Sequence, residues 1–246
     1  MKTHILSFLG LVFLAACSGD SASGGFPQTC SDAQEAAVEE TGSRPSNGTF
    51  TLYVDGDEQR PWEAYCHDMK KSEPKEFISV DESDNYSQLS VGMSIVETTY
   101  RRLRIDPIRL EIDLTDATFA STDDNPSMAM FPDDREHLPV GWAQFGDGSE
   151  FGGPTAEAKI DLSGTAFAFS EEASEESFYC TVAAGGDGSA SEISIASDRL
   201  SVTLTSTNAT NSVPTKTVAD CDDFGGTETE GDDFAEGALP LEYLGE

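Results

Sequence analysis

Apolar and polar residues alternate in short runs along most of the chain, which is the pattern of half-buried β-strands. The first two runs, GTFTLYVDGD from Gly48 and PWEAYC from Pro61, are separated by a polar turn and together predict a β-hairpin. The positions expected to face the core are Phe50, Leu52, Val54, Trp62, Ala64 and Cys66.

Further runs with the same period predict strands in the rest of the chain. One continuous strand is expected at 95–105. The clearest alternation lies at 108–114, where every second residue is apolar and the residues between them are charged. The apolar positions of that clearest run are Ile108, Leu110, Ile112 and Leu114. Shorter strands are expected at 76–80, 158–162, 165–169, 178–182, 192–195 and 199–205.

One stretch has helical rather than strand character. The segment SDAQEAAVEE, 31–40, carries acidic residues near its start, where they favour the helix dipole, and Ser31 is expected to cap it. The helix is expected to end at Thr41 or Gly42. Because no longer helix interrupts the strands, the chain is expected to be mostly β, as an antiparallel sandwich or an irregular barrel.

The first residues have the layout of an export signal. MKTHILSFLGLVFLAA, Met1–Ala16, has an early lysine, an apolar run too short to span a bilayer, and small residues before Cys17. The residues from Leu14 resemble the lipobox of bacterial lipoproteins; an ordinary signal peptide with an incidental cysteine is the alternative. The resemblance implies a lipoprotein signal peptide at 1–16, then lipidated Cys17 and a flexible linker at 17–27. Acyl chains would hold the protein at the outer membrane, on its periplasmic side or at the cell surface.

The formal net charge of −32 restricts the partners of the chain. Such an acidic protein repels nucleic acid and anionic lipid headgroups, so no nucleic-acid partner is expected, and membrane contact is expected only through the lipid anchor. Apolar residues make up 37% of the chain, which is enough for a core. The acidic, glycine-rich segment 223–246 is expected to be a tail that docks weakly.

Four cysteines follow Cys17 in the chain, namely Cys30, Cys66, Cys180 and Cys221. An even number in an exported protein predicts two disulfides, with three pairings open. Proximity along the chain favours Cys30 with Cys66 and Cys180 with Cys221. A zinc site built from the thiols is disfavoured, because no two of these cysteines are closely spaced. The predicted fold is therefore mostly β, with one short N-terminal helix and two disulfides.

One long segment resembles a known module. NGTFTLYVDGDEQRPWEAYCHDM, 47–69, resembles the opening of a GON domain, the C-terminal module of ADAMTS-type metalloproteases, which also occurs in bacterial exported proteins. TTYRRLRIDPIRLEIDLTDATFA from Thr98 and AKIDLSGTAFAFS from Ala158 resemble later parts of the same module. The resemblance is best over 28–170, and a GON-like β-rich domain is expected over 28–222.

Two implications of this resemblance concern cysteine and zinc. Fibrinogen-like domains begin similarly, with an upstream cysteine bonded to the cysteine of the second strand, which supports pairing Cys30 with Cys66. ADAMTS-type proteins are zinc metalloendopeptidases, so zinc and proteolysis are implied for this chain only through the host proteins. An HExxH motif is missing, and only His67 and His137 lie beyond the leader. No catalytic residue and no metal ligand is assigned, and the chain is expected not to be an enzyme.

Calcium is an open alternative as a bound ion. The stretches DDNPSMAMFPDD, 123–134, and DCDDFGG, 220–226, could each collect oxygen ligands, although neither has the spacing of a known calcium loop. Solvated acidic loops are the other interpretation of both stretches.

Scarce positive charge gathers at Arg101, Arg102, Arg104 and Arg109. Cross-strand ion pairs are one interpretation, and a partner-binding surface of Tyr100, Arg102 and Arg104 on one strand face is the other. The predicted function is that of a cell-envelope lipoprotein with a non-catalytic module that binds an extracellular protein or glycan. The alternatives are an ancillary domain of a zinc metalloendopeptidase system and a calcium-stabilised structural protein of the envelope.

Overall fold

The structure is a computed structural model that describes residues 25–91, 94–123, 136–145, 155–171, 189–208 and 238–245. Its strands form two sheets, each with seven strands. The first sheet contains, in spatial order, β1 Gly48–Tyr53, β2 Pro61–His67, β3 Lys75–Ser79, β6 Arg102–Asp106, β7 Glu111–Asp113, β14 Ala238–Tyr243 and β11 Phe167–Phe169. The second contains β12 Ser189–Ile195, β13 Ser201–Asn208, β10 Ala156–Asp161, β4 Tyr86–Val91, β5 Ser94–Tyr100 and β8 Ala120–Thr122, with β9 Ala143–Phe145 parallel to β4.

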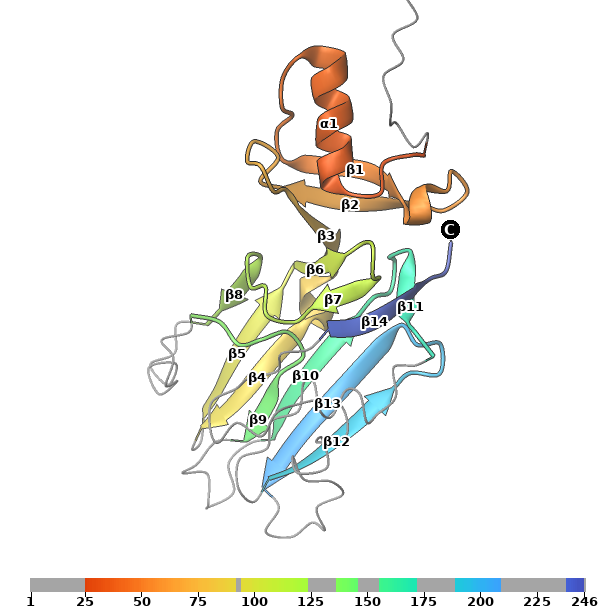
Figure 1. Ribbon diagram of the computed structural model, residues 1–246. Helices are drawn as coiled ribbons and strands as arrows, with labels where there is room; N and C mark the ends of the chain where they lie inside the picture. The colour runs from red at the N-terminus through yellow and green to blue at the C-terminus, as the bar shows by residue number, and fades with distance from the viewer. Residues whose placement is uncertain are drawn as a thin grey trace, which may run out of the picture.

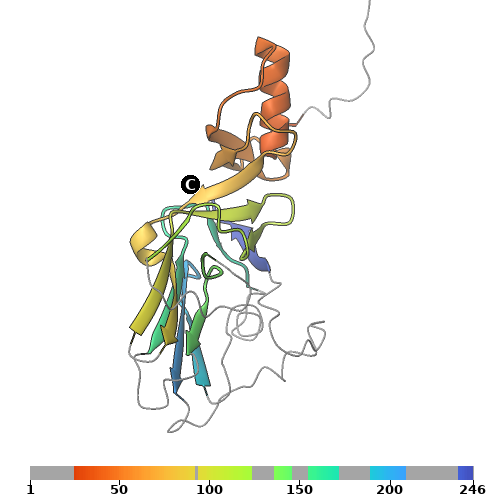
Figure 2. The same ribbon diagram turned by 90° about the vertical axis from the view of Figure 1, so that its left-hand side faces the viewer.

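The sheets are open and almost entirely antiparallel, so the predicted mostly-β class is confirmed and closure into a barrel is not observed. The helix α1, Cys30–Thr41, lies over β1 and β2 at one end of the molecule, and the second sheet forms the other end (Figures 1 and 2). Buried side chains from both sheets form a single hydrophobic core. No helix within the described ranges is both long and apolar enough to cross a membrane.

The helix is held by caps at both ends. Thr29 is extended and its hydroxyl accepts the Asp32 amide, while the Asp32 carboxylate accepts the Thr29 amide. The cap is therefore Thr29, and the prediction of Ser31 is wrong. The predicted end is confirmed, because Gly42 adopts the left-handed conformation with φ of 73° and its amide bonds back to Val38.

The predicted hairpin of β1 and β2 is confirmed in its strands and in its core-facing positions. Leu52 pairs with Trp62 and Phe50 with Ala64, and the side chains of Leu52, Trp62 and Ala64 are buried. The strands are joined by a short 3-10 turn, η1 (Val54–Gly56), which contains the buried Val54. A disulfide joins Cys30 of α1 to Cys66 of β2, as the preferred pairing predicted.

The prediction of one strand over 95–105 is wrong, because the chain turns a corner at Arg101. The strand β5 ends at Tyr100 in the second sheet, and β6 begins at Arg102 in the first. The Arg101 amide bonds to the Phe119 carbonyl, and the Arg101 carbonyl accepts the Val80 amide. This corner connects the two sheets and changes which alternate residues face the core.

The clearest predicted strand, 108–114, is strand only in its second half. Residues 107–110 form the turn between β6 and β7 instead. The Asp106 carboxylate accepts the amides of Ile108 and Arg109, which closes this turn against continued extension. Ile108 is consequently 62% exposed rather than in the core.

The prediction of a weakly docked tail over 223–246 is wrong for its last part. Residues 238–243 form β14, which lies between β7 and β11 inside the first sheet. Leu239 is fully buried and faces Ile112 across the strand pair. The second predicted disulfide and the predicted strand at 178–182 lie outside the described residues, because Cys180 and Cys221 are not among them.

Candidate binding cleft

A cleft of about 520 Å³ opens beside the β1–β2–β3 end of the first sheet. One wall consists of residues from these three strands, namely Thr49, Trp62, Glu63, Tyr65, Ile78 and Ser79. The opposite wall consists of residues 164–167, before and at the start of β11, and of Gly245 after β14. Segments from both ends of the chain therefore meet here, and the volume lies within the usual range for small-molecule sites.

The two walls are fastened to each other by contacts between distant residues. The Tyr243 hydroxyl donates to the Pro61 carbonyl at 2.8 Å, and the rings of Trp62 and Phe167 meet edge to face with centroids 5.1 Å apart. The Leu244 amide donates to the Ala166 carbonyl at 2.9 Å. Two of these contacts come from β14 and the residue after it, where the sequence predicts a weakly docked tail instead of a strand of the domain.

The lining combines hydroxyl groups, one carboxylate and one unsatisfied buried donor. Glu63 is exposed and accepts a 3.1 Å hydrogen bond from the Thr51 hydroxyl. Trp62 is only 3% exposed, and its indole N–H has no acceptor among the described residues. A buried donor without a partner is costly, and such groups call for an explanation.

Arg102 borders the cleft without lining it. It pairs with the cleft residue Ser79 across β3 and β6, and its guanidinium carbon lies 3.7 Å from the ring centroid of Tyr65, another cleft residue. The same group lies 4.8 Å from the ring centroid of Phe119, and the guanidinium of Arg101 lies 5.4 Å from that ring. Both arginines therefore stack on one aromatic ring next to the cleft.

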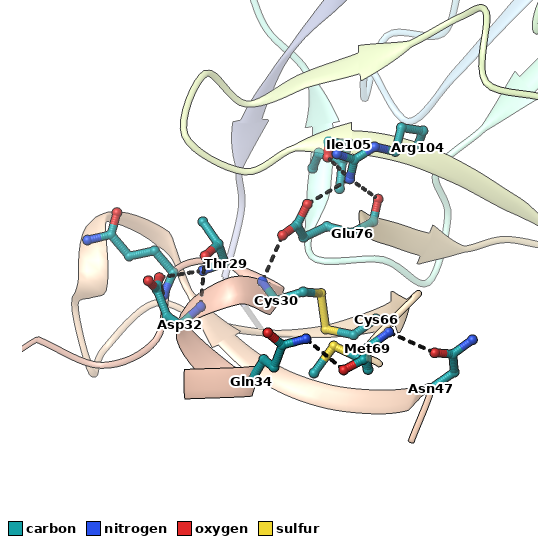
Figure 3. Close-up of a disulfide and its surroundings, with 11 residues drawn as sticks. Thr29, Cys30, Asp32, Gln34, Asn47, Cys66, Met69, Glu76, Arg104 and Ile105 are labelled. Atoms are coloured by element: carbon teal, nitrogen blue, oxygen red, sulfur yellow. Dashed lines mark hydrogen bonds and ion pairs between the residues drawn. A yellow bond between two sulfur atoms is a disulfide. The ribbon is translucent and has the colours of Figure 1, made fainter. Parts of the chain in front are cut away.

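Arg104 plays a different part and belongs to the framework. Its Nη1 lies 2.7 Å from the carboxylate of Glu76, which is only 6% exposed and also accepts the Cys30 amide at 2.7 Å (Figure 3). The same nitrogen donates to the Glu76 and Ile105 carbonyls. This pair ties β6 and β3 to the start of α1, directly beside the disulfide.

The proposed surface of Tyr100, Arg102 and Arg104 on a single strand face is not formed. Tyr100 is 1% exposed and its hydroxyl donates to the Leu138 carbonyl. Burial raises the pKa of this phenol, which keeps it neutral. Because the chain turns at Arg101, Tyr100 points into the core, while the two arginines lie on a different sheet.

Neither His67 nor His137 lies in a cluster of metal-ligating side chains among the described residues. His67 Nδ1 lies 3.0 Å from the Asn47 amide nitrogen, and His67 Nε2 lies 3.4 Å from the Asp68 carboxylate. His137 Nδ1 lies 2.8 Å from the Thr122 hydroxyl. Within the described ranges, no group of three or more histidine, cysteine or acidic side chains is placed to hold a metal ion. Except for Asp123, both predicted calcium stretches fall outside those ranges.

Two carboxylates of the framework have lowered pKa values. Burial raises the pKa of Asp116, but hydrogen bonds from Lys75 and Thr118 outweigh it and leave the pKa below 3.8. Burial likewise raises the pKa of Asp161, and hydrogen bonds from Ser163 and Lys159 bring it below 3.8. Both groups hold strands in place and neither lines the cleft.

A comparison with family models finds a match over the helix and the first strands. Residues 27–94 match the GON domain. The GON match spans α1 and β1–β4, and so contains the whole first wall of the cleft. It indicates an ancillary domain and confirms the resemblance over this segment. The stretches from Thr98 and Ala158, as well as the second wall, lie beyond the matched residues. Neither the curated proteins nor the solved structures contain a significant match to this chain.

Several cleft residues escaped the sequence prediction. Glu63 and residues 164–167 lie in segments that resemble the GON module, but no pattern in those segments marks them as site residues, and only the fold brings them together. Gly245 could have been found from the alternation of Leu239, Leu241 and Tyr243 just before it, which predicts a strand.

Proposed function

We propose that the protein is a cell-envelope lipoprotein, anchored through acylated Cys17 at the outer membrane, whose GON-like region is a non-catalytic binding module. The cleft between β1–β3 and the 164–167 turn is its ligand site. The observation that carries this proposal is a cleft of about 520 Å³ whose first wall carries the exposed hydroxyl and carboxylate groups of Thr49, Glu63 and Ser79. A ligand with several hydrogen-bonding groups would find partners among these side chains.

The lining favours a glycan over a protein loop as the ligand. The exposed residues of the first wall, Thr49, Glu63 and Ser79, offer hydroxyl and carboxylate groups rather than an apolar patch. Sugar hydroxyls both donate and accept, so they match such a lining. A protein partner would instead be expected to insert an apolar anchor into a pocket.

An ancillary role in a metalloendopeptidase system is the second candidate, and the GON match favours it. In that role the module would bind a substrate or matrix partner while a different chain supplies zinc and catalysis. This chain carries no HExxH motif for the purpose. Casein hydrolysis by the purified protein, together with stoichiometric zinc in its mass spectrum, would overturn the non-catalytic proposal.

A cleft-filling variant tests the binding function. Ser79 is exposed on the first wall, so Ser79→Trp should fill the cleft without disturbing the core. On an array of neutral, amino and acidic glycans, we expect the wild-type protein to bind and Ser79→Trp to lose that binding. Ser94→Trp is the matched control, because Ser94 is an exposed strand residue outside the cleft. The proposal would be refuted if both variants bind equally well, or if none of the three proteins binds any glycan on the array.

A further inference from the structure

The basic residues of this acidic protein divide into two groups. Most described lysines and arginines contact a carboxylate, as an excess of acid predicts. The exceptions within the described ranges are Arg44, Lys70, Arg101 and Arg102. Arg44 donates instead to the Lys70 carbonyl. Arg101 and Arg102 are consecutive in the chain, and their guanidinium groups lie over the same Phe119 ring. Two adjacent arginines without a carboxylate are therefore an unusual feature of a chain with net charge −32.

Stacking prepares these arginines to bind an anion. The Arg102 guanidinium lies over both Tyr65 and Phe119, with distances of 3.7 and 4.8 Å to the two ring centroids. A stacked guanidinium has lost much of its side-chain freedom already, and its planar N–H edge can still bind a carboxylate or sulfate through two hydrogen bonds. The Arg102 Nε–H is buried and has no acceptor among the described residues.

The position of Arg102 links this anion site to the cleft. Tyr65 and Ser79 line the cleft, and Arg102 stacks on the first and pairs with the second. Glu63 and Thr49 lie further along the same wall. A ligand in the cleft would thus meet a cationic edge near Ser79 and hydroxyl or carboxylate acceptors beyond it.

We propose that the cleft binds an acidic sugar, whose anionic group is held by Arg102 with support from Arg101, while its hydroxyl groups bond to Glu63 and Thr49. This inference rests on the binding function proposed for the cleft and specifies its ligand class. A volume of about 520 Å³ accommodates one or two sugar rings. Carboxylate from a uronic acid and sulfate from a sulfated sugar share the required chemistry.

The strong negative charge of the protein does not prevent this binding. At physiological ionic strength, charges farther apart than about 8 Å are largely screened, so the local arginines dominate the potential at the cleft edge. The net charge should instead disfavour long polyanions, whose chain would extend over the acidic surface. The expected ligands are therefore short or sparsely charged saccharides.

Calorimetry on the purified full-length protein tests the inference with four probes: digalacturonate, its carboxyl-reduced neutral counterpart, a sulfated chondroitin disaccharide whose carboxyl group has also been reduced, and tetraglutamate. We expect an acidic sugar to bind about tenfold more tightly than the neutral one, as one charge-assisted contact implies. Stronger binding of digalacturonate would identify carboxylate as the bound group, and stronger binding of the chondroitin disaccharide would identify sulfate.

Substitutions of these arginines, with a matched control elsewhere on the surface, separate this inference from a general charge effect. Arg101→Gln/Arg102→Gln and Arg102→Lys should both bring the preference for the acidic sugar close to one, since lysine keeps the charge but lacks the planar fork. Arg44→Gln/Lys70→Gln removes the same charge elsewhere and should leave the preference intact. Melting temperatures check folding, and Arg102→Lys alone serves if the double variant is unstable.

The outcomes distinguish the failure of the inference from the failure of the binding function. Equal affinity for the acidic and neutral disaccharides would overturn the anion contact and leave the cleft as a sugar site. Arginine-dependent binding of tetraglutamate alone would overturn the sugar and identify an acidic peptide. If no probe binds and the glycan array is also negative, both proposals are wrong.

Discussion

Replacing Arg104 should destabilise the fold, because Arg104 neutralises a buried carboxylate. In Arg104→Met, the Glu76 carboxyl group would lose its cationic partner while only 6% exposed, and its remaining described partner would be the Cys30 amide. Removing one member of a buried pair costs about 3–5 kcal/mol. Since Arg104 itself is 21% exposed, water can replace part of the interaction, and we expect a loss of about 3 kcal/mol.

Urea denaturation followed by tryptophan fluorescence measures this loss. Arg101→Met is the matched control: Arg101 is exposed and lies 5.4 Å from the Phe119 ring, so its loss should cost only about 0.5 kcal/mol. The double variant Glu76→Gln/Arg104→Met removes the buried charge and should recover more than half of the loss. If Arg104→Met is no less stable than Arg101→Met, or if the double variant recovers nothing, the structural role assigned to Arg104 is wrong.

Three other predictions follow from burial, loop closure and pKa. Leu239→Ala should lower the free energy of unfolding by about 3 kcal/mol, whereas Leu244→Ala, at a position 51% exposed, should change it little; equal effects in chemical denaturation would remove β14 from the core. Replacing Cys30 and Cys66 by alanine opens a loop with sequence separation 36 and should cost about 4 kcal/mol, measured against the wild type under oxidising conditions; no loss would contradict the bond. The pKa of Asp116 is lowered below 3.8, so its contribution to stability is present above pH 3.8 and lost as the pH falls through the folded-state value. Asp116→Asn should accordingly flatten the acid limb of the stability profile, and an unchanged acid limb would refute this contribution.

The hairpin of β1 and β2 could be predicted because all of its information is local. Alternation fixes which residues face inward, and the polar turn fixes where the chain reverses. Leu52 and Trp62 are buried as the pattern indicates. Gly42 likewise predicts the end of α1, since glycine readily adopts the left-handed conformation that ends a helix.

The corner at Arg101 could not be predicted by counting alternation within a single strand. Buried positions run through Thr98 and Tyr100 in β5 but through Leu103 and Ile105 in β6, so their parity changes at the corner. A change of parity marks a bulge or a bend, yet sequence alone does not say that the chain enters another sheet. Alternation over a single strand therefore places Tyr100 on one face with Arg102 and Arg104, whereas the fold puts Tyr100 in the other sheet.

The cleft was beyond the reach of the sequence because its walls are distant in the chain. Pro61 and Tyr243 touch across 182 positions, and the contact forms only once β14 is paired with β7 and β11. The GON match covers the first wall and not the second. Local alternation therefore predicts strands that form one wall of the cleft, whereas the second wall depends on pairing between strands that are distant in the sequence.

The central claim is that the cleft beside Trp62 binds a saccharide, and the two tryptophans of the chain test it directly. In a ¹H–¹⁵N spectrum, the indole resonances of Trp62 and Trp142 can be assigned by Trp62→Phe. Only Trp62 lines the cleft. On titration with digalacturonate, we predict a saturable shift of the Trp62 indole with Trp142 unchanged. A saturable shift confined to Trp142, or no shift of Trp62 at a concentration where calorimetry shows binding, would contradict the account.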